Sequence, residues 1–246
     1  MPLNKAKGRM FKSVGWTWNP IVGCTHKCEY CWAKTLRSRW GKPFKPAIQE
    51  SGFKDKFPND GSIIFVGSMG DLFCEGMEDD WISRVIVKAS EATNNRFLFQ
   101  TKNPKRVIDW LPNMDGLKQR PIIGTTIETN RDTPWTLAPT PTERFLQLWY
   151  STDEHAYSIH DTFLSLEPLS DFDLETLFYM IKTIAPIAIE IGLENYTKYL
   201  PKPSPEKVRS LIDLLQKENI IYVLKPGLNE YLMSSSLSAE GGRDGC

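Results

Sequence analysis

Short apolar runs alternate with amphipathic stretches along most of the chain. The apolar runs are rich in β-branched and aromatic residues and lack polar alternation, which is typical of strands covered on both faces. The strands predicted in this way cover residues 14–18, 63–66, 97–99, 122–127, 163–166, 187–191 and 220–224.

The segments between these runs carry apolar residues at helical spacing. Helices are predicted for residues 32–40, 79–93, 104–111, 142–150, 173–184 and 204–218, the last with Ser204 as N-cap and Pro205 in the first helical position. Repeated strand–helix alternation predicts right-handed βαβ units and a parallel sheet. About seven such strands can close into a full or partial barrel or form an open doubly wound sheet. The periodicity does not separate these two arrangements.

Composition and charge narrow the class of protein. The 246 residues include 30 basic and 30 acidic side chains, which excludes a strongly basic binder of duplex nucleic acid. No apolar run approaches the ~18 residues of a membrane span, and the first residues lack a signal-peptide pattern. We therefore expect a cytoplasmic protein without a membrane partner. No composition shift divides residues 14–228, so we expect one α/β domain between a basic arm at 1–13 and a tail at 229–246.

Three of the five cysteines fall within eight residues, in a C-x3-C-x2-C pattern: Cys24, Cys28 and Cys31. In a reducing compartment such a cluster indicates metal binding rather than disulfides. Thiolates suit iron–sulfur clusters or zinc. A cubane cluster takes a thiolate on each of four irons, so three cysteines leave one iron open to another ligand.

Structural zinc is the competing interpretation. Cys28 and Cys31 form one acceptable zinc knuckle, and Cys24, His26 or Cys74 are available to complete four ligands. The chain lacks the second, matching C-x2-C that a zinc ribbon normally has. Zinc would make the protein a nucleic-acid-binding module without catalysis. A third alternative is a cluster-bearing redox or regulatory protein.

The cysteine segment, with Tyr30 just before its third cysteine, resembles the signature of the radical S-adenosylmethionine (SAM) superfamily. Residues 16–24, 67–73, 100–104, 165–168 and 225–227 resemble, in the same order, an uncharacterised phage- and prokaryote-associated branch. The resemblance covers about residues 14–228.

That resemblance implies a partial (β/α)6-type TIM-like barrel in a single domain. A [4Fe–4S] cluster would be held by Cys24, Cys28 and Cys31, and SAM would bind its open iron. One electron, from an external donor such as flavodoxin or ferredoxin, would cleave SAM to methionine and a 5′-deoxyadenosyl radical that abstracts hydrogen from a substrate.

The resemblance also implies roles for individual residues. Tyr30 would lie beside the adenine of SAM. The superfamily's Gly-Gly-Glu-like turn is replaced here by residues 67–71, so Ser68 or Asp71 would hold the SAM amine. Residues 189–194, with Gly192, partly resemble the segment that contacts adenine.

Polar residues follow the predicted strands, where ligands of parallel α/β folds bind. They are Ser68, Asp71, Gln100, Thr101, Lys102, Thr126, Glu128, Asn130, Glu167, Glu194, Asn195 and Lys225. Strand ends also meet polar loops in any protein. Glu167 and Lys225 are the preferred catalytic pair, because each follows an apolar strand and precedes proline; Thr126 and Glu128 are candidates for cofactor binding.

The remaining cysteines lie outside the cluster. Cys74 follows Asp71 closely and is a candidate hydrogen donor to a substrate radical, although a buried structural thiol is the commoner case. Cys246 ends the predicted tail.

Basic and aromatic residues interleave after the cysteines. Lys34, Arg37, Arg39, Lys42 and Lys45 alternate with Trp32, Trp40 and Phe44, and the N-terminal arm adds Lys5, Lys7, Arg9 and Lys12. This composition suits a phosphate backbone and stacked bases, and equally a solvated helix face. Nucleic acid is therefore the substrate class to consider first.

Overall fold

The computed structural model describes residues 3–152, 160–194 and 200–240. Its main sheet has eight strands, which occur in chain order: β1 (Leu3–Lys5), β2 (Trp16–Trp18), β5 (Ile63–Val66), β6 (Arg96–Gln100), β7 (Ile122–Thr126), β8 (Asp161–Leu166), β9 (Ala188–Ile191) and β10 (Tyr222–Leu224). From β2 to β10 all neighbours are parallel, and β1 pairs with β2 antiparallel. This uninterrupted order is that of an open, partial barrel, and it excludes the doubly wound sheet.

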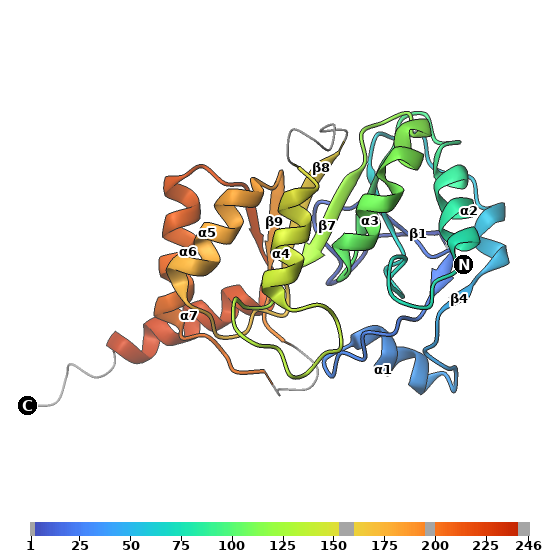
Figure 1. The fold of residues 1–246 in the computed structure, drawn as a ribbon. Coiled ribbons are helices and arrows are strands. Elements are labelled where there is room, and N and C mark those ends of the chain that lie inside the picture. Colours follow the sequence, from blue (N-terminus) through green and yellow to red (C-terminus); the bar gives the residue numbers. More distant parts are fainter. Residues whose placement is uncertain (1–2, 153–159, 195–199, 241–246) are drawn as a thin grey trace, which may run out of the picture.

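Seven helices accompany the described strands (Figure 1): α1 (Trp32–Arg39), α2 (Asp79–Ala89), α3 (Pro104–Trp110), α4 (Pro141–Tyr150), α5 (Leu174–Ile184), α6 (Pro205–Lys217) and α7 (Pro226–Glu240). Short 3-10 turns occupy Glu50–Lys54 and Leu111–Gly116, and β3 (Ile21–Val22) pairs with β4 (Ala47–Ile48). Ser204 caps α6 and Pro205 opens it, as predicted. No described helix has the length and apolar character of a membrane span.

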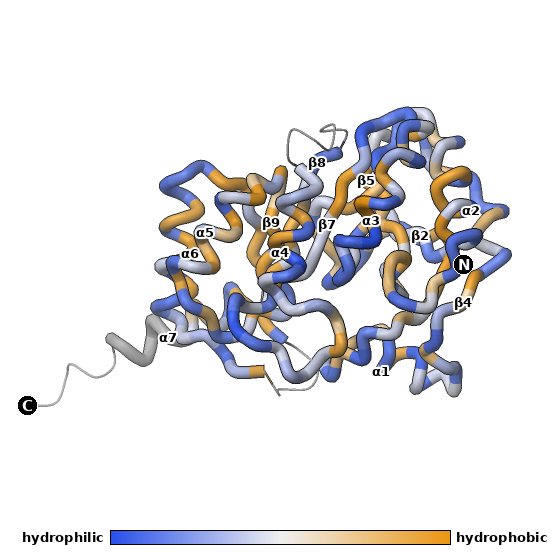
Figure 2. The backbone as a smooth tube through the Cα atoms, viewed as in Figure 1, coloured by the Kyte–Doolittle hydropathy of each residue, from blue (hydrophilic) through white to orange (hydrophobic). Residues whose placement is uncertain are grey.

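The two faces of the sheet contact different parts of the molecule, because side chains point alternately to opposite faces along each strand. Ile64, Phe97 and Ile189 belong to the face that packs against helices and forms the large core. The opposite, inner face carries Phe65 and Phe163 in a smaller apolar cluster. In Figure 2 apolar stretches recur along the strands and along the helices.

The N-terminal segment covers part of the inner face. The ring of Phe11 lies 5.4 Å from that of Phe65 and 5.1 Å from that of Phe163, measured between centroids. Ser13 donates two hydrogen bonds of 3.0 Å to the carboxylate of Glu190, on β9. Residues 3–13, expected to be an arm outside the domain, therefore contribute a strand to the sheet and side chains to its interior.

The C-terminal segment also differs from the expectation. Residues 226–240 form α7 where a tail was predicted from 229. Leu228 is fully buried, and the Tyr231 hydroxyl donates to the Pro203 carbonyl oxygen at 3.0 Å. The Pro-Gly pair at its start and the serines that follow gave no helical signal, so tertiary packing determines this helix. Cys246 lies outside the described residues.

Candidate functional site

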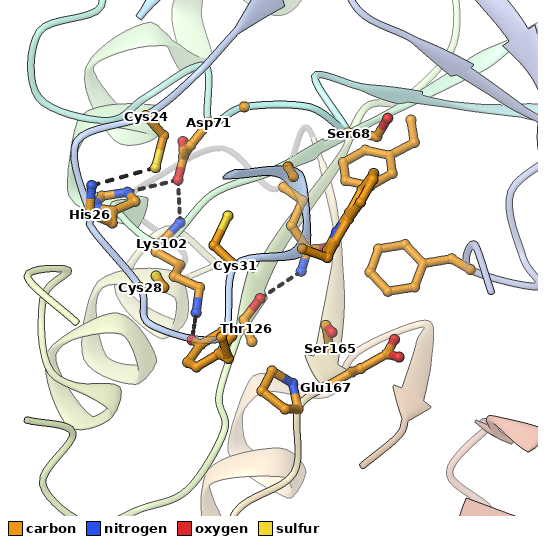
Figure 3. Close-up of a pocket in the computed structure, with 18 of the residues that line it drawn as sticks. Cys24, His26, Cys28, Cys31, Ser68, Asp71, Lys102, Thr126, Ser165 and Glu167 are labelled. Atoms are coloured by element: carbon orange, nitrogen blue, oxygen red, sulfur yellow. Dashed lines mark hydrogen bonds and ion pairs between the residues drawn. The ribbon is translucent and has the colours of Figure 1, made fainter. Parts of the chain in front are cut away.

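A cavity of about 420 Å³ opens at the carboxyl ends of the strands. Three parts of the chain surround it: the N-terminal segment, the cysteine loop with the start of α1 and Phe44, and the residues that end or follow β5 to β9. Its lining includes Lys7, Arg9, Phe11, Cys24, Cys28, Tyr30, Cys31, Trp32, Phe44, Phe65, Ser68, Asp71, Gln100, Lys102, Thr126, Ser165, Glu167 and Glu194. In Figure 3 the cysteines lie on one side of this space and Ser165 and Glu167 on another.

Two glycines bring the cysteine loop against the loop that follows β5. Gly23 has a φ of +77°, and a Cβ there would lie 2.1 Å from the Lys45 carbonyl oxygen. A Cβ on Gly70 would lie 2.6 Å from the carbonyl oxygen of Gly23. The two glycines form a parallel bridge, and the Gly23 N–H donates to the Met69 carbonyl oxygen at 3.0 Å. Only glycine permits this backbone-to-backbone approach, which places Cys24 beside the carboxyl end of β5.

The three cysteines of the motif all line the cavity, and each sulfur has a polar neighbour. Cys24 Sγ accepts from the His26 N–H at 3.4 Å. Cys31 is the N-cap of α1, and its Sγ accepts from the Lys34 N–H at 3.4 Å. Cys28 Sγ lies 3.2 Å from the Thr136 hydroxyl. Such hydrogen bonds, and the positive end of a helix dipole, stabilise negatively charged sulfur.

Burial opposes that charge as long as no cation is bound. The Cys74 thiol and burial raise the pKa of the Cys24 thiol above its ordinary value. Burial likewise raises the pKa of the Cys31 thiol. A metal group bound by these thiolates must therefore displace protons from the cysteines.

The arrangement of donors fits a cluster better than a single ion. Tetrahedral zinc with bonds of about 2.3 Å would hold its sulfurs about 3.8 Å apart. Among the residues that the structure describes, no three His, Cys, Asp or Glu side chains converge in that way. His26 is instead paired with Asp71 at 2.9 Å. A cubane takes its thiolates on different irons, so it suits three cysteines that border one cavity without meeting.

Cys74 does not line the cavity. Its side chain is fully buried and contacts Cys24, which lowers the pKa of the Cys74 thiol. Cys74 is therefore a buried structural thiol. Among the described residues, no contact places it against the cavity, where a substrate would bind.

Asp71 anchors the loops around the cavity. Its buried carboxylate accepts from the Thr101 hydroxyl at 2.7 Å and from the N–H groups of Lys102 and Phe73 at 2.8 and 3.0 Å. His26 is its fourth partner, and although burial opposes ionisation, these donors hold the pKa of Asp71 below its ordinary value. The Asp71 carboxylate already has four hydrogen-bond partners in the protein. The geometry therefore does not support the expectation that Asp71 binds the amine of SAM.

Ser68 also lines the cavity, at the edge formed by the loop after β5. Its hydroxyl donates to Asn19 Oδ1 at 3.1 Å, and the same oxygen accepts from the Met69 N–H at 2.9 Å. Ser68 keeps its acceptor oxygen available and stays a candidate for the cofactor's polar groups. Sequence reasoning missed Asn19. Its position directly after a predicted strand was the signal that could have identified it.

A buried charge network lies beneath the cysteine loop. Glu128 is fully buried and forms ion pairs with Lys102 and, at 2.8 Å, with Arg144, which is fully buried too. Tyr30 donates its hydroxyl to Glu128. Although burial opposes ionisation, the two cations hold the pKa of Glu128 well below its usual range. Glu128 is not part of the cavity wall, so it positions Tyr30 and Lys102, which are.

Arg144 was not predicted from the sequence. It lies on α4 beside the buried Phe145. A cation within the apolar stripe of a predicted helix was the signal that could have identified it, because a buried cation needs a partner. The pKa of the Tyr30 hydroxyl is raised well above its ordinary value by burial and by Glu128. Tyr30 therefore stays neutral and donates, with its ring along the cavity wall.

Glu167 and Lys225, the pair preferred from the sequence, do come together. Lys225 Nζ lies 3.6 Å from Glu167 Oε2 and 3.0 Å from Glu190 Oε2, and it donates to the Arg9 carbonyl oxygen at 2.8 Å. Burial and Glu190 raise the pKa of Glu167 despite the nearby lysine. Glu167 lines the cavity, whereas Lys225 lies behind it and secures the N-terminal segment.

Gly192 supports this pair. A Cβ at position 192 would lie 2.9 Å from Lys225 Cγ and 3.0 Å from Glu167 Cδ. Gly192 does not line the cavity, so the geometry offers a packing reason for this glycine in place of the adenine contact expected from the resemblance.

The other strand-end residues divide between cavity and scaffold. Thr126 lines the cavity and accepts from Gln100 Nε2 at 3.1 Å. Glu194 lines it as well, and Asn195 lies outside the described residues. Asn130 accepts from the Asp173 N–H at 2.8 Å, away from the cavity.

Known structures share this fold. A mutant form of spore photoproduct lyase matches with a TM-score of 0.63 and 12% identity, over 92% of this chain and 80% of that one. A second form, with bound AdoMet and dinucleoside spore photoproduct, matches with a TM-score of 0.59 and 12% identity, over 85% of this chain. Streptococcus suis SuiB bound to S-adenosylmethionine matches with a TM-score of 0.51 and 11% identity, over 85% of this chain and 49% of SuiB.

The likeness to these structures confirms the fold expected from the resemblance, a single α/β domain with a mostly parallel sheet in the form of a partial barrel. The chain spans 63% of the length of the AdoMet-bound lyase. No curated protein matches the sequence. The family model that matches residues 11–148, more than half of the chain, is described as "Protein of unknown function (DUF5131)", and the chain belongs to that family.

Proposed function

We propose that the protein is a radical SAM enzyme with a [4Fe–4S] cluster on Cys24, Cys28 and Cys31. When bound, the reduced cluster supplies the electron that cleaves SAM and so generates the radical that takes hydrogen from a substrate. The observation that carries the proposal is that all three cysteines line the cavity at the carboxyl ends of the strands. No fourth cysteine from the described part of the chain joins them there.

The chain's own residues prepare the cavity for such a cofactor. Tyr30 lies between Cys28 and Cys31 in the sequence. Its hydrogen bond to Glu128 holds it at the cavity wall. The N-terminal segment covers part of the inner face with Phe11, whose ring packs against those of Phe65 and Phe163. Ser68 and Thr126 offer hydroxyl groups to a polar ligand.

Glu167 is suited to contact the substrate. It lines the cavity, and its pKa is raised by burial and by Glu190. A carboxyl group held nearer to protonation can donate a hydrogen bond or a proton, as well as accept one. Lys225 and Gly192 fix its position from behind.

A one-electron donor, such as flavodoxin or ferredoxin, belongs to the same proposal as the external partner. The zinc-stabilised module is the alternative, and the cluster is favoured over it because no three donor side chains of the described residues converge on one ion.

Release of 5′-deoxyadenosine tests the proposal before the substrate is known. The protein is purified without oxygen, reconstituted with iron and sulfide, and given SAM and dithionite. We expect 5′-deoxyadenosine and methionine to accumulate over several turnovers, measured by liquid chromatography and mass spectrometry. The same protein without dithionite serves as the control. A fully loaded protein that releases no 5′-deoxyadenosine contradicts the proposal.

A further inference from the structure

Charge is divided unevenly along this neutral chain. The first 45 residues contain ten Lys and Arg side chains and a single acidic residue, Glu29. Of the thirty basic and thirty acidic residues, twenty basic and twenty-nine acidic ones follow position 45. The zero net charge therefore conceals a first segment of about +9 beside a remainder of about −9.

No lysine or arginine of this first segment forms an ion pair with a carboxylate in the part of the chain that the structure describes. Every ion pair among the described residues takes its lysine or arginine from position 84 onward. Twelve of the twenty lysines and arginines that follow position 45 do form ion pairs. A concentrated group of cations without such pairs indicates an anionic partner.

The unpaired cations form a surface that leads to the cavity. Lys34, Arg37 and Arg39 lie on α1, and Lys42 and Lys45 follow it; these five residues are named the basic strip. Figure 1 shows α1 apart from the row of helices that covers the sheet.

Aromatic residues beside and within the strip reach the cavity wall. Trp32, which precedes the strip in sequence, and Phe44, which lies between its last two members, line the cavity, and so do Lys7 and Arg9 of the N-terminal segment. Cations of the N-terminal segment thus border the cavity, and aromatic residues of the strip region border it from a second part of the chain.

Exposed aromatic rings accompany the strip. Trp32 is 37% and Trp40 57% exposed, at the two ends of α1. Exposed tryptophans beside unpaired cations are the combination that binds nucleic acid single strands, through phosphate contacts and base stacking. A duplex keeps its bases stacked on one another, so it cannot use these rings.

We propose that the basic strip binds single-stranded nucleic acid and directs one base of the strand into the cavity. The binding step stands on the charges and rings alone. The second step, in which the strand is the substrate, rests on the proposed function.

Binding is tested with the full chain, without a cluster, by fluorescence anisotropy of labelled 20-nucleotide oligothymidylate and oligouridylate. We expect both to bind, with a slope of log affinity against log salt of about −2 to −4, for three to five phosphate contacts. Comparison of the two oligonucleotides shows whether DNA or RNA is preferred. A Trp40→Leu variant should bind about tenfold more weakly with little change in the salt slope, because stacking rather than charge is removed.

Two triple variants separate the strip from general charge. Lys34→Gln, Arg39→Gln and Lys42→Gln together should weaken binding about thirtyfold or more and flatten the salt slope. The matched control replaces three exposed lysines elsewhere, Lys105→Gln, Lys118→Gln and Lys217→Gln, and should stay within about twofold of the wild type.

Several results would overturn the inference. They are equal loss in both triple variants, no binding at 50 mM salt, a duplex bound as tightly as a single strand, or heparin bound as tightly with no effect of Trp40→Leu. The proposed function fails independently of these. A protein that binds oligonucleotide but releases no 5′-deoxyadenosine refutes only the enzyme, and the reverse result refutes only the strip.

Discussion

Replacing Glu128 by alanine is expected to lower the free energy of unfolding by about 3–5 kcal/mol, the typical cost of leaving buried charges without their partner. Glu128 and Arg144 are both fully buried, and Lys102 is the second cation on the same carboxylate. The variant would leave the fully buried Arg144 without a carboxylate to neutralise it, and Lys102 at the cavity wall would lose its partner. Urea unfolding of the two proteins at pH 7 measures the difference.

The matched control is Glu29→Ala, which removes an exposed carboxylate near the same loop and should change stability by less than about 0.5 kcal/mol. The effect also depends on pH. Because the pKa of Glu128 in the folded protein lies below the ordinary value of 4.5, its contribution is complete above that pH and is lost as the pH falls further. Equal stability of Glu128→Ala and Glu29→Ala at pH 7 would show that the network is not formed.

Replacing Cys28 by alanine is expected to reduce 5′-deoxyadenosine formation at least about a thousandfold, since the cluster loses one of its three thiolates. The same result is expected for Cys24→Ala and Cys31→Ala. Iron and acid-labile sulfide, measured after anaerobic reconstitution, should fall together with the activity.

Cys74→Ala provides the control for the loss of a cysteine as such. Cys74 is buried and does not line the cavity, so this variant should keep the iron content of the wild type. Loss of iron in Cys74→Ala equal to that in Cys28→Ala would assign Cys74 to the ligand set and would favour a closed site over an open one.

Strands and helices with strong periodicity were predictable. The apolar run at 63–66 is β5 with the same bounds, and the Ser204-Pro205 signal starts α6 where expected. The choice between a barrel and a doubly wound sheet depends on which strands pair. Local patterns carry no information about that pairing, and the resemblance supplied it.

The two ends of the chain were misread for a related reason. Residues 3–13 and 226–240 have weak local signals, and contacts distant in sequence determine their structure. Lys225 binding the Arg9 carbonyl oxygen joins both ends across 216 positions. No pattern within a short window can reveal such a contact.

At the site, the sequence indicated which residues gather around the cavity but not what each of them does there. The spacing of Cys24, Cys28 and Cys31 indicated residues that the fold brings to one cavity. Asp71 and Glu128 look alike in sequence, as acids after apolar strands. The structure surrounds Asp71 with hydrogen-bond donors and Glu128 with cations, and these partners come from distant segments.

The central claim is that one iron stays free of protein ligands so that SAM binds it. Electron paramagnetic resonance of the anaerobically reconstituted, dithionite-reduced protein tests this directly, with spectra recorded before and after addition of SAM. The account predicts the signal of a reduced [4Fe–4S] cluster whose g values shift when SAM is added. A spectrum unchanged by saturating SAM, or a protein that holds one zinc ion and no sulfide, would contradict it.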